Sequence, residues 1–285
     1  MFDNSRKKFI SLFKDKVRKT IRESGYTQTY IPYNKSSNEY LITNSKINYP
    51  KCDLGLPIPP KEFRSGYDEN DELYIQDSKT DIGKMLDIAG LSGFEIREKM
   101  KILDFGCSSG RMIRQFKPFA DKCEIWGTDV NAEFIYWCNQ YLNPPFHFAT
   151  TTFNAHLPFE EKYFNFIYAG SVFTHIDNLI ETWLLELRRV MSDDGRLYIT
   201  VHDNDTMEIF DKKNSIPLAL YLNKNSFYES ARKDFDFFVM NRSKSPLVFF
   251  DLQYLKKMLS SMFDIISINP ETYGYQTSIL LKRKV

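Results

Sequence analysis

The segment 102–111, ILDFGCSSGR, combines a carboxylate with small residues where a short apolar run ends. Asp104 lies in this run, and Gly106 and Gly110 follow it. A turn of this kind between a strand and a helix lets a ligand approach the main chain closely. The spacing differs from the GxGxxG fingerprint of dinucleotide binding, and the sequence has no glycine-lysine-serine/threonine phosphate loop. A ligand with a pyrophosphate is therefore not expected here.

A second carboxylate, Asp129, ends the next apolar run of the sequence. At the carboxyl end of a strand, such a side chain can accept hydrogen bonds from both hydroxyl groups of a ribose. Together with the glycine-containing turn, it indicates an adenosine-type ligand that lacks a pyrophosphate. A structural alternative also fits: the glycines permit a tight turn, and Asp129 caps the helix expected near Asn131.

These residues need a sheet that brings the strand ends to one edge. After residue 79, nearly continuous apolar runs alternate with helical patterns, which is typical of a parallel sheet covered on both faces. The final runs 263–269 and 277–284 are joined by a link too short for a crossover helix, so they predict an antiparallel hairpin. The predicted fold class is α/β, with a doubly wound, mostly parallel, seven-stranded sheet. We expect helices at about 79–90, from 110, and at 131–142, 178–191 and 251–261, and strands at 101–105, 124–128, 146–149, 164–169 and 196–201.

Composition limits the classes of protein that remain. The 285 residues suffice for one substantial domain with appendages, and a net charge of +1 provides no general attraction for nucleic acid. The four cysteines form no CxxC pair and the four histidines lack metal-ligand spacing, so neither disulfides nor a metal site are expected. No apolar run approaches the roughly 20 residues that span a bilayer, and no apolar signal segment is present. The sequence therefore predicts a cytoplasmic protein.

Two parts of the sequence depart from the alternating pattern. Residues 1–78 begin with a basic amphipathic helix and continue as a polar arm rich in tyrosine and proline, which we expect to form a lid. The helix could lie on an anionic membrane or a partner, or pack on its own domain. Residues 204–246 interrupt the main domain, 79–285, with a group of aromatic side chains. These form either a wall for a sugar or planar acceptor or a small hydrophobic core of their own.

In the order of its motifs, the chain resembles the class I S-adenosylmethionine-dependent methyltransferases. The resemblance covers about residues 80–285 and implies a Rossmann-like methyltransferase fold. It also implies S-adenosylmethionine as the cofactor and S-adenosylhomocysteine as the product. It rests on the final hairpin and on the segments ILDFGCSSGR, WGTDVN, FNAHLPFEEKYFNFIYAGSVFTHI and WLLELRRVMSDDGRLYITVHD.

The first motif of this family implies the site for the methionine part of the cofactor. Asp104 and the main chain from Gly106 through Cys107 to Ser108 would contact it, and Gly110 completes the motif. Ser108 stands where the family has its middle glycine, and a small residue can serve there. Two further residues, at the end of the fourth strand, would cover the methionine: Gly170 and Ser171.

The resemblance also implies the nucleoside site. Asp129 would bind the ribose hydroxyls, and Val130 would flank the adenine. Asn154, followed by Ala155, stands where the family has an acid that binds the adenine amino group. An amide oxygen can accept the same hydrogen bond, although it carries no charge.

Methyl transfer requires an aligned acceptor and, for a hydroxyl or an amine, a group that removes its proton. His175 in SVFTHI, and His202 with Asp203 in TVHD, stand at the ends of the fourth and fifth strands, where a base must lie. Histidine titrates near neutrality and suits this role. A structural histidine bonded to a carbonyl is at least as common, so both roles stay open. The segment NPPF at 143–146 matches a motif with which amino-methylating DNA enzymes hold a flipped base. That motif acts only after the fourth strand, whereas NPPF here precedes the third, so we expect its prolines only to end a helix.

The predicted function is methyl transfer from S-adenosylmethionine, an activity of class EC 2.1.1. The later segments, from VFTHI to WLLELRRVMSDDGRLYITVHD, resemble those of methyltransferases of bacterial surface glycans and secondary metabolites. This resemblance favours O-methylation of a sugar or small metabolite. A macromolecule methyltransferase that holds RNA or protein through the basic N-terminal helix is one alternative. A catalytically silent scaffold is another, but it would predict a degraded cofactor site. No nucleic acid partner is expected, and contact of the N-terminal helix with a membrane surface stays open.

Overall fold

The computed structural model describes residues 49–68, 70–213, 215–242 and 245–284, together with residues 12, 13, 16, 17, 19 and 20. Those six residues are helical and exposed to solvent. The rest of the basic helix expected at residues 1–25, and the arm as far as residue 48, lie outside the described residues. In the described parts of the chain, no helix is both long enough and apolar enough to cross a membrane.

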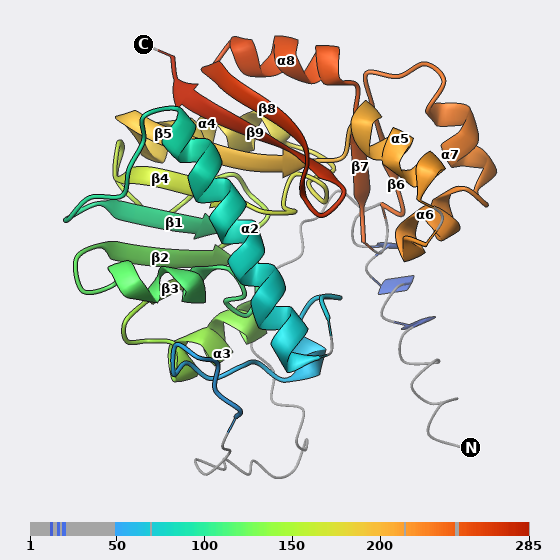
Figure 1. The fold of residues 1–285 in the computed structure, drawn as a ribbon. Coiled ribbons are helices and arrows are strands. Elements are labelled where there is room, and N and C mark those ends of the chain that lie inside the picture. Colours follow the sequence, from blue (N-terminus) through green and yellow to red (C-terminus); the bar gives the residue numbers. More distant parts are fainter. Residues whose placement is uncertain are drawn as a thin grey trace, which may run out of the picture.

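The central sheet has the strand order β3-β2-β1-β4-β5-β9-β8 (Figure 1). The first five strands of the chain pair in parallel, whereas β9 pairs antiparallel with both β5 and β8. The predicted α/β class, the seven-stranded sheet and the antiparallel final hairpin are therefore confirmed. The strands are β1 (Lys101–Phe105), β2 (Glu124–Asp129), β3 (His147–Thr150), β4 (Phe164–Ala169), β5 (Met191–Val201), β8 (Phe263–Tyr273) and β9 (Gln276–Arg283).

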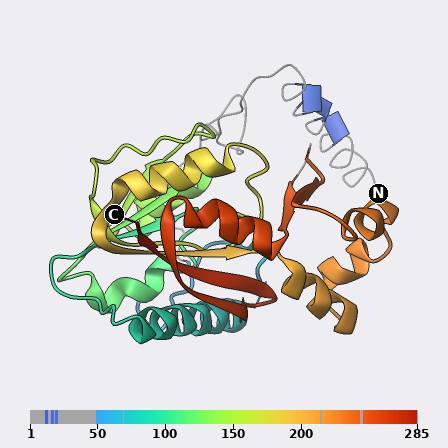
Figure 2. The same ribbon diagram turned by 90° about the horizontal axis from the view of Figure 1, so that it is seen from above.

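Helices cover both faces of the sheet. On one face the strands pack against α2, the 3-10 helix η2 and α3, and on the other against α4 and α8. Figure 2 shows α2 and α4 on opposite sides of the sheet. Neighbouring strand residues serve opposite faces, as Ile102 and Leu103 do, and both are fully buried, which explains the continuous apolar runs. The helices are η1 (Lys61–Phe63), α2 (Asp71–Leu91), η2 (Ile113–Phe119), α3 (Ala132–Tyr141), α4 (Ile180–Val190) and α8 (Leu252–Ser260).

Two helices differ from the sequence-based expectation. α2 begins at Asp71 rather than at 79, because the side chain of Asn70 caps it by accepting two main-chain hydrogen bonds, of 2.9 and 3.1 Å. The boundary expected between residues 78 and 79 therefore falls inside this helix. The helix expected from Gly110 is instead the short η2, which contains Pro118, and proline lacks the N–H that a longer α-helix needs.

The insertion at 204–246 forms a small body beside the sheet (Figure 1). It contains α5 (Asn204–Lys212), α6 (Pro217–Leu222), α7 (Ser226–Ala231) and β6 (Phe237–Met240), and β6 pairs antiparallel with β7 (Leu247–Phe250). Of the two alternatives for its aromatic residues, the structure has the local hydrophobic core, although Phe227 stays 54% exposed. The buried members of this core include Met207, Phe210, Tyr228, Phe238 and Phe249.

Candidate active site

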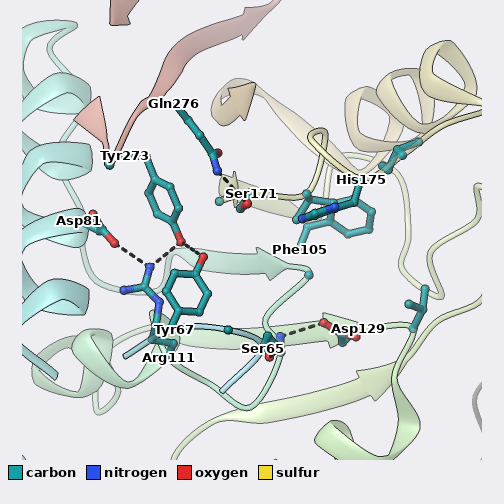
Figure 3. Close-up of a pocket in the computed structure, with 18 of the residues that line it drawn as sticks. Ser65, Tyr67, Asp81, Phe105, Arg111, Asp129, Ser171, His175, Tyr273 and Gln276 are labelled. Atoms are coloured by element: carbon teal, nitrogen blue, oxygen red, sulfur yellow. Dashed lines mark hydrogen bonds and ion pairs between the residues drawn. The ribbon is translucent and has the colours of Figure 1, made fainter. Parts of the chain in front are cut away.

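A cavity of about 770 Å³ lies beyond the carboxyl ends of β1, β2 and β4 (Figure 3). In an open α/β sheet this is the edge where ligands bind. Seven of the residues singled out in the sequence line it: Gly106, Ser108, Asp129, Val130, Gly170, Ser171 and His175. The others do not: Asp104, Cys107, Gly110, Asn154, Ala155, His202 and Asp203.

The turn after β1 requires glycine at position 106. Gly106 has a φ of +81°, and a Cβ atom there would lie 2.4 Å from Cγ2 of Val172. The main chain after β1 therefore closely approaches the loop after β4 at the cavity. Gly110 has a φ of +79°, and a Cβ atom there would lie 2.5 Å from Leu142. Together with the buried Cys107, Gly110 shapes the turn from behind, without lining the cavity.

Two main-chain hydrogen bonds hold Asp129 at the end of β2. Its Oδ2 accepts from the N–H of Ser108 and its Oδ1 from the N–H of Asn131, each at 2.8 Å. Burial raises the pKa of this carboxyl, and the two hydrogen bonds oppose the rise. Each oxygen can accept a further hydrogen bond, which leaves capacity for two ribose hydroxyls. Because the side chain of Asn131 itself caps α3, a capping role does not account for Asp129.

Asp104 lies behind the turn, 3% exposed. Burial raises the pKa of its carboxyl to about 7, against the opposing effect of the nearby Tyr168 hydroxyl. Among the described residues, its Oδ2 has no hydrogen-bond partner of good geometry. At this pKa the carboxyl is partly protonated at neutral pH, which reduces the cost of leaving a buried oxygen without a partner.

In the loop after β3, the residues at the cavity are not the ones expected from the sequence for the nucleoside site. Side chains there alternate as in a strand: Thr151 is buried, Thr152 is exposed, Phe153 is half-buried and Asn154 is exposed. This alternation brings Thr151 and Phe153 to the cavity, but neither Asn154 nor Ala155. An adenine-binding role for Asn154 stays a prediction without support from its position. This end of the cavity is lined by Val130, Phe134, Thr151 and Phe153.

His175 lies in the loop after β4 and is solvent-accessible through the cavity (Figure 3). Its Nδ1 lies 2.7 Å from the main-chain carbonyl oxygen of Pro246. A carbonyl oxygen only accepts, so Nδ1 carries the proton and Nε2 of the neutral ring has the lone pair. The loss of hydration around the ring lowers the pKa of His175, and the hydrogen bond to Pro246 partly offsets this. At pH 7 the ring is therefore neutral, with an acceptor nitrogen.

His202 and Asp203 have structural surroundings. The His202 side chain is 2% exposed, and its ring stacks on Phe249 with centroids 4.9 Å apart. Burial lowers the pKa of His202 to about 3. Asp203 caps α5, because its Oδ1 accepts from the N–H of Thr206 at 3.1 Å and from the hydroxyl of Thr277 at 2.9 Å. Both residues are buried and neither lines the cavity, so a structural role suits them better than a role as the base. The carbonyl bond expected of a structural histidine is made by His175, whereas the ring nitrogens of His202 have no hydrogen-bond partner of good geometry among the described residues.

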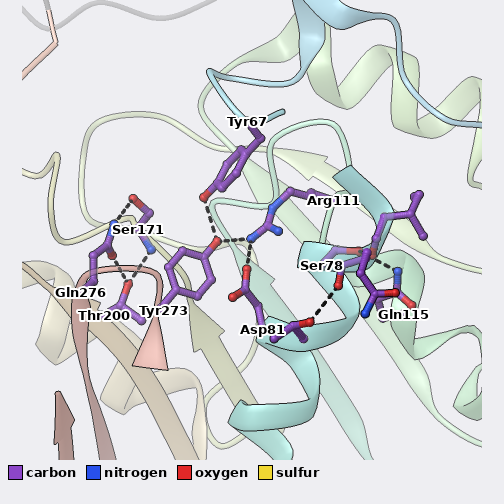
Figure 4. A network of polar contacts seen from close by, with 12 residues as sticks. Tyr67, Ser78, Asp81, Arg111, Gln115, Ser171, Thr200, Tyr273 and Gln276 are labelled. Atoms are coloured by element: carbon purple, nitrogen blue, oxygen red, sulfur yellow. Dashed lines mark hydrogen bonds and ion pairs between the residues drawn. The ribbon is translucent and has the colours of Figure 1, made fainter. Parts of the chain in front are cut away.

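The sequence-based reasoning missed Arg111, which directly follows the glycine-containing turn and is 3% exposed. One terminal nitrogen, Nη2, donates to Asp81 of α2 at 2.6 Å and to the Tyr273 hydroxyl (Figure 4). The Tyr273 and Tyr67 hydroxyls lie 2.8 Å apart, and the guanidinium carbon lies 4.0 Å from the centroid of the Tyr67 ring. All four side chains line the cavity. The network thus joins the arm, α2, the turn and the hairpin around one ligand space.

The described part of the arm, 49–68, lies against the glycine-containing turn. The Ser109 hydroxyl donates to the carbonyl oxygen of Phe63 at 2.6 Å. The hydroxyls of Ser65 and Ser108 lie 2.8 Å apart, and both residues line the cavity. The arm therefore stands where a lid over the turn would stand, and its action as a lid stays a prediction.

Other parts of the molecule contribute indirectly. No described residue of the insertion lines the cavity, so the insertion acts there through the hydrogen bond between Pro246 and His175. Among the described residues, no group of three or more His, Cys, Asp or Glu side chains could hold a metal ion. All four cysteines are free thiols.

Comparison with known proteins identifies a domain and a fold. Residues 103–199 match the family model of a methyltransferase domain. The structure of the PH0226 protein from Pyrococcus horikoshii OT3 is similar, with a TM-score of 0.52 and 15% identity, over 74% of this chain and 95% of that chain. A S-adenosylmethionine-dependent methyltransferase from Clostridium acetobutylicum ATCC 824 is similar with a TM-score of 0.52 and 11% identity, over 73% and 92%. At these identities the likeness establishes the fold alone. Among curated proteins, none matches the sequence.

The fold and the matched domain are those of the class I S-adenosylmethionine-dependent methyltransferases. The resemblance stated from the sequence is thereby confirmed, and S-adenosylmethionine is the cofactor of this chain. The residues present fit that group: the turn at Gly106 has no space for a side chain, and the Asp129 carboxylate keeps hydrogen-bonding capacity at the cavity. Asp104, which the resemblance also implies, lies behind the turn and does not line the cavity.

Proposed function

We propose that the protein transfers the methyl group of S-adenosylmethionine to a hydroxyl oxygen of a sugar, a glycan unit or a small metabolite. One observation carries the proposal: His175 lines the same cavity as Gly106 and Asp129. A candidate base, a candidate ribose ligand and the turn of the first methyltransferase motif thus share one ligand space.

Each part of the cavity would bind one part of the cofactor. The Asp129 carboxylate would accept hydrogen bonds from the ribose hydroxyls, and Val130 and Phe153 would flank the adenine. When bound, the cofactor supplies a methyl group that its sulfonium already activates. The protein then has to orient the acceptor and take up a proton. The methionine part would lie along the main chain of Gly106, Ser108, Gly170 and Ser171.

His175 would be the proton acceptor. Its Nδ1 proton is bonded to the Pro246 carbonyl oxygen, so the acceptor hydroxyl would pass its proton to Nε2 as the oxygen attacks. The lowered pKa keeps the ring neutral before the step. Proton uptake makes the ring a cation, and its hydrogen bond to Pro246 then becomes charge-assisted and stronger.

The size and the walls of the cavity support a small, hydroxyl-bearing acceptor. A volume of about 770 Å³ falls within the roughly 300–1,000 Å³ of small-molecule sites, and here it has to contain both the cofactor and the acceptor. Part of the wall consists of polar side chains of α2, which suit hydrogen bonding to hydroxyl groups better than contact with an apolar acceptor. These side chains are Asp77, Thr80 and Lys84.

The decisive experiment measures S-adenosylhomocysteine formation. The protein is incubated with S-adenosylmethionine and, in separate reactions, with pools of glycan oligosaccharides, hydroxylated metabolites, RNA and protein. Turnover with sugars or metabolites that falls about 10²-fold or more in His175→Ala, and that needs a higher cofactor concentration in Asp129→Ala, supports the proposal. Turnover with RNA or protein alone would contradict the acceptor class. Wild-type protein that binds neither the cofactor nor its product would contradict the enzymatic function and favour a scaffold.

A further inference from the structure

Three polar side chains at the ends of three neighbouring strands form a closed hydrogen-bonded ring. The main-chain N–H of Ser171, after β4, donates to Oγ1 of Thr200 on β5 at 2.7 Å. Thr200 Oγ1 donates to Oε1 of Gln276, the first residue of β9, at 2.7 Å. Gln276 Nε2 returns to Oγ of Ser171 at 2.9 Å (Figure 4).

The main-chain N–H of Ser171 can only donate, so the direction of the bond to Thr200 is fixed. In the structure, the Thr200 hydroxyl then donates to Oε1 of Gln276. The amide oxygen of Gln276 only accepts, which leaves its NH2 group to donate to the Ser171 hydroxyl. The Ser171 hydroxyl proton is then available to Thr174 Oγ1, 3.1 Å away. A residue without both an acceptor and a donor at position 276 therefore cannot close the ring.

The ring lies at the origin of the loop that carries His175. Ser171 has a φ of +58°, a left-handed conformation that a residue with a side chain adopts only where its surroundings hold it. Two hydrogen bonds then hold the loop beyond Ser171. The Ser171 hydroxyl lies 3.1 Å from that of Thr174, and the N–H of His175 donates to the carbonyl oxygen of Val172 at 2.9 Å. The conformation imposed on Ser171 is thus passed on to His175 within four residues.

The ring also lies between the sheet and the ligand space. Thr200 is fully buried and Gln276 is 5% exposed, yet Ser171 and Gln276 both line the cavity. The start of β9 therefore contacts the loop after β4 directly, beside the cavity. Inside a protein, a fully satisfied ring of this kind favours one arrangement of its members over others.

We propose that Gln276 is a positioning residue, which holds the loop 171–176 through Thr200 and Ser171 and thereby sets the orientation of His175. The role of His175 as the base rests on the proposed function, whereas the positioning itself does not. Gln276 transfers no proton and needs no contact with the reacting atoms.

The test uses the full-length protein and two ways to open the ring. Thr200→Val has nearly the same shape but lacks the hydroxyl, and Thr200→Ser restores the hydroxyl on a smaller side chain. Gln276→Leu removes both polar groups, and Gln253→Leu makes the same change at an exposed position on α8. The readout is the NMR titration of the His175 ring in protein with labelled histidine, assigned with His175→Ala among only four histidines. Melting temperature and affinity for S-adenosylhomocysteine are measured on the same samples.

We expect Thr200→Val and Gln276→Leu to raise the titration midpoint of His175 toward the ordinary value of about 6.5 for histidine. The loosened loop exposes the ring to more water, and the protonated form gains most from that hydration. Thr200→Ser and Gln253→Leu should keep the wild-type midpoint. The other titratable groups near this loop are His202 and Asp177, and Asp177 pairs with Arg242 at 3.2 Å. All four variants exchange one uncharged side chain for another, so none of them alters a charge near His175.

Two results would overturn the inference. The first is an unchanged His175 midpoint in Thr200→Val and Gln276→Leu accompanied only by a lower melting temperature, which would make the ring purely structural. The second is a midpoint shift in Thr200→Ser as large as in Thr200→Val. Should Gln276→Leu fail to fold, the Thr200 pair alone decides. None of these readouts needs an acceptor, so an absence of methyl transfer would affect the proposed function and not this test.

Discussion

His175 and Pro246 meet where the insertion rejoins the main domain, with 2.7 Å between the Nδ1 of the ring and the main-chain carbonyl oxygen. Two residues farther on, the N–H of Val248 donates to the carbonyl oxygen of Thr174 at 2.9 Å. The loop that carries the candidate base is therefore fastened to the returning strand at two points. The insertion thus orients His175, although none of its described residues lines the cavity.

Replacement of His175 by alanine should lower turnover about 10²-fold or more, the range usual for the loss of a general base. Affinity for S-adenosylhomocysteine should stay within about twofold, since the cofactor-side residues are untouched. Because the pKa of His175 is lowered, wild-type turnover should be constant at neutral pH and fall only below about pH 6.5, as the ring becomes protonated. Rate measurements from about pH 5 to 9, with calorimetry, check both points.

His202→Ala serves as the comparison for this prediction. This side chain is buried away from the cavity, so its removal should lower the melting temperature and change turnover only modestly. Near-normal turnover of both variants over the whole pH range would show that no histidine removes the proton. Catalysis would then consist of orienting an acceptor that is already nucleophilic.

Asp129→Ala should weaken binding of S-adenosylmethionine by about 1–3 kcal/mol, because the ribose hydroxyls lose their paired acceptor. The same change also frees the N–H groups of Ser108 and Asn131, so part of the loss comes from a less ordered turn. Calorimetry measures the affinity, and Asp121→Ala, at an exposed position between η2 and β2, is the matched control. Equal affinities of Asp129→Ala and the wild type would remove the ribose assignment.

Phe153→Ala and Asn154→Ala distinguish two neighbouring candidates for the adenine site. Phe153 lines the cavity, so its truncation should weaken cofactor binding by about 1–2 kcal/mol through lost apolar contact. Asn154 is exposed outside the cavity, and its replacement should change the affinity by less than about 0.5 kcal/mol. The reverse order of effects would restore the adenine-binding role predicted from the sequence for Asn154.

The buried ring of His202 should make the protein sensitive to acid. Its pKa is about 3 in the folded chain and about 6.5 when unfolded, so the unfolded state binds the proton more tightly between these values. As the pH falls from about 6.5, the free energy of unfolding should therefore decrease by about 1.4 kcal/mol per pH unit from this group alone. His202→Phe, which retains the aromatic contact with Phe249, should flatten that slope in urea unfolding at several pH values.

The strands could be predicted because burial on both faces makes them nearly continuous apolar runs, as in 164–169. The start of α2 was missed because its first turns carry charged side chains, although Asn70 followed by Asp71 was a visible capping signal. The helix predicted from Gly110 was wrong for a different reason. Its apolar spacing is helical, but Pro118 prevents a regular α-helix there.

Some residues of the candidate site could be predicted from a local pattern, and others could not. Gly106 and Asp129 could be found because each lies at the end of a strand that the sequence marks by itself. The hydroxyl pair of Tyr67 and Tyr273 could not, since 206 positions separate the two residues and no local pattern joins them. The same holds for Gln276, whose importance depends on strand order. Only the folded sheet places β9 beside β5.

That strand order has a consequence for how the molecule is made. β9 fills the gap between β5 and β8, although both precede it in the sequence. A chain released before residue 276 would have two unpaired strand edges in the middle of its sheet, and such edges pair readily with other chains. Interrupted synthesis should therefore yield aggregates rather than a smaller working domain, and during translation the sheet can close only after the segment 276–283 has left the ribosome.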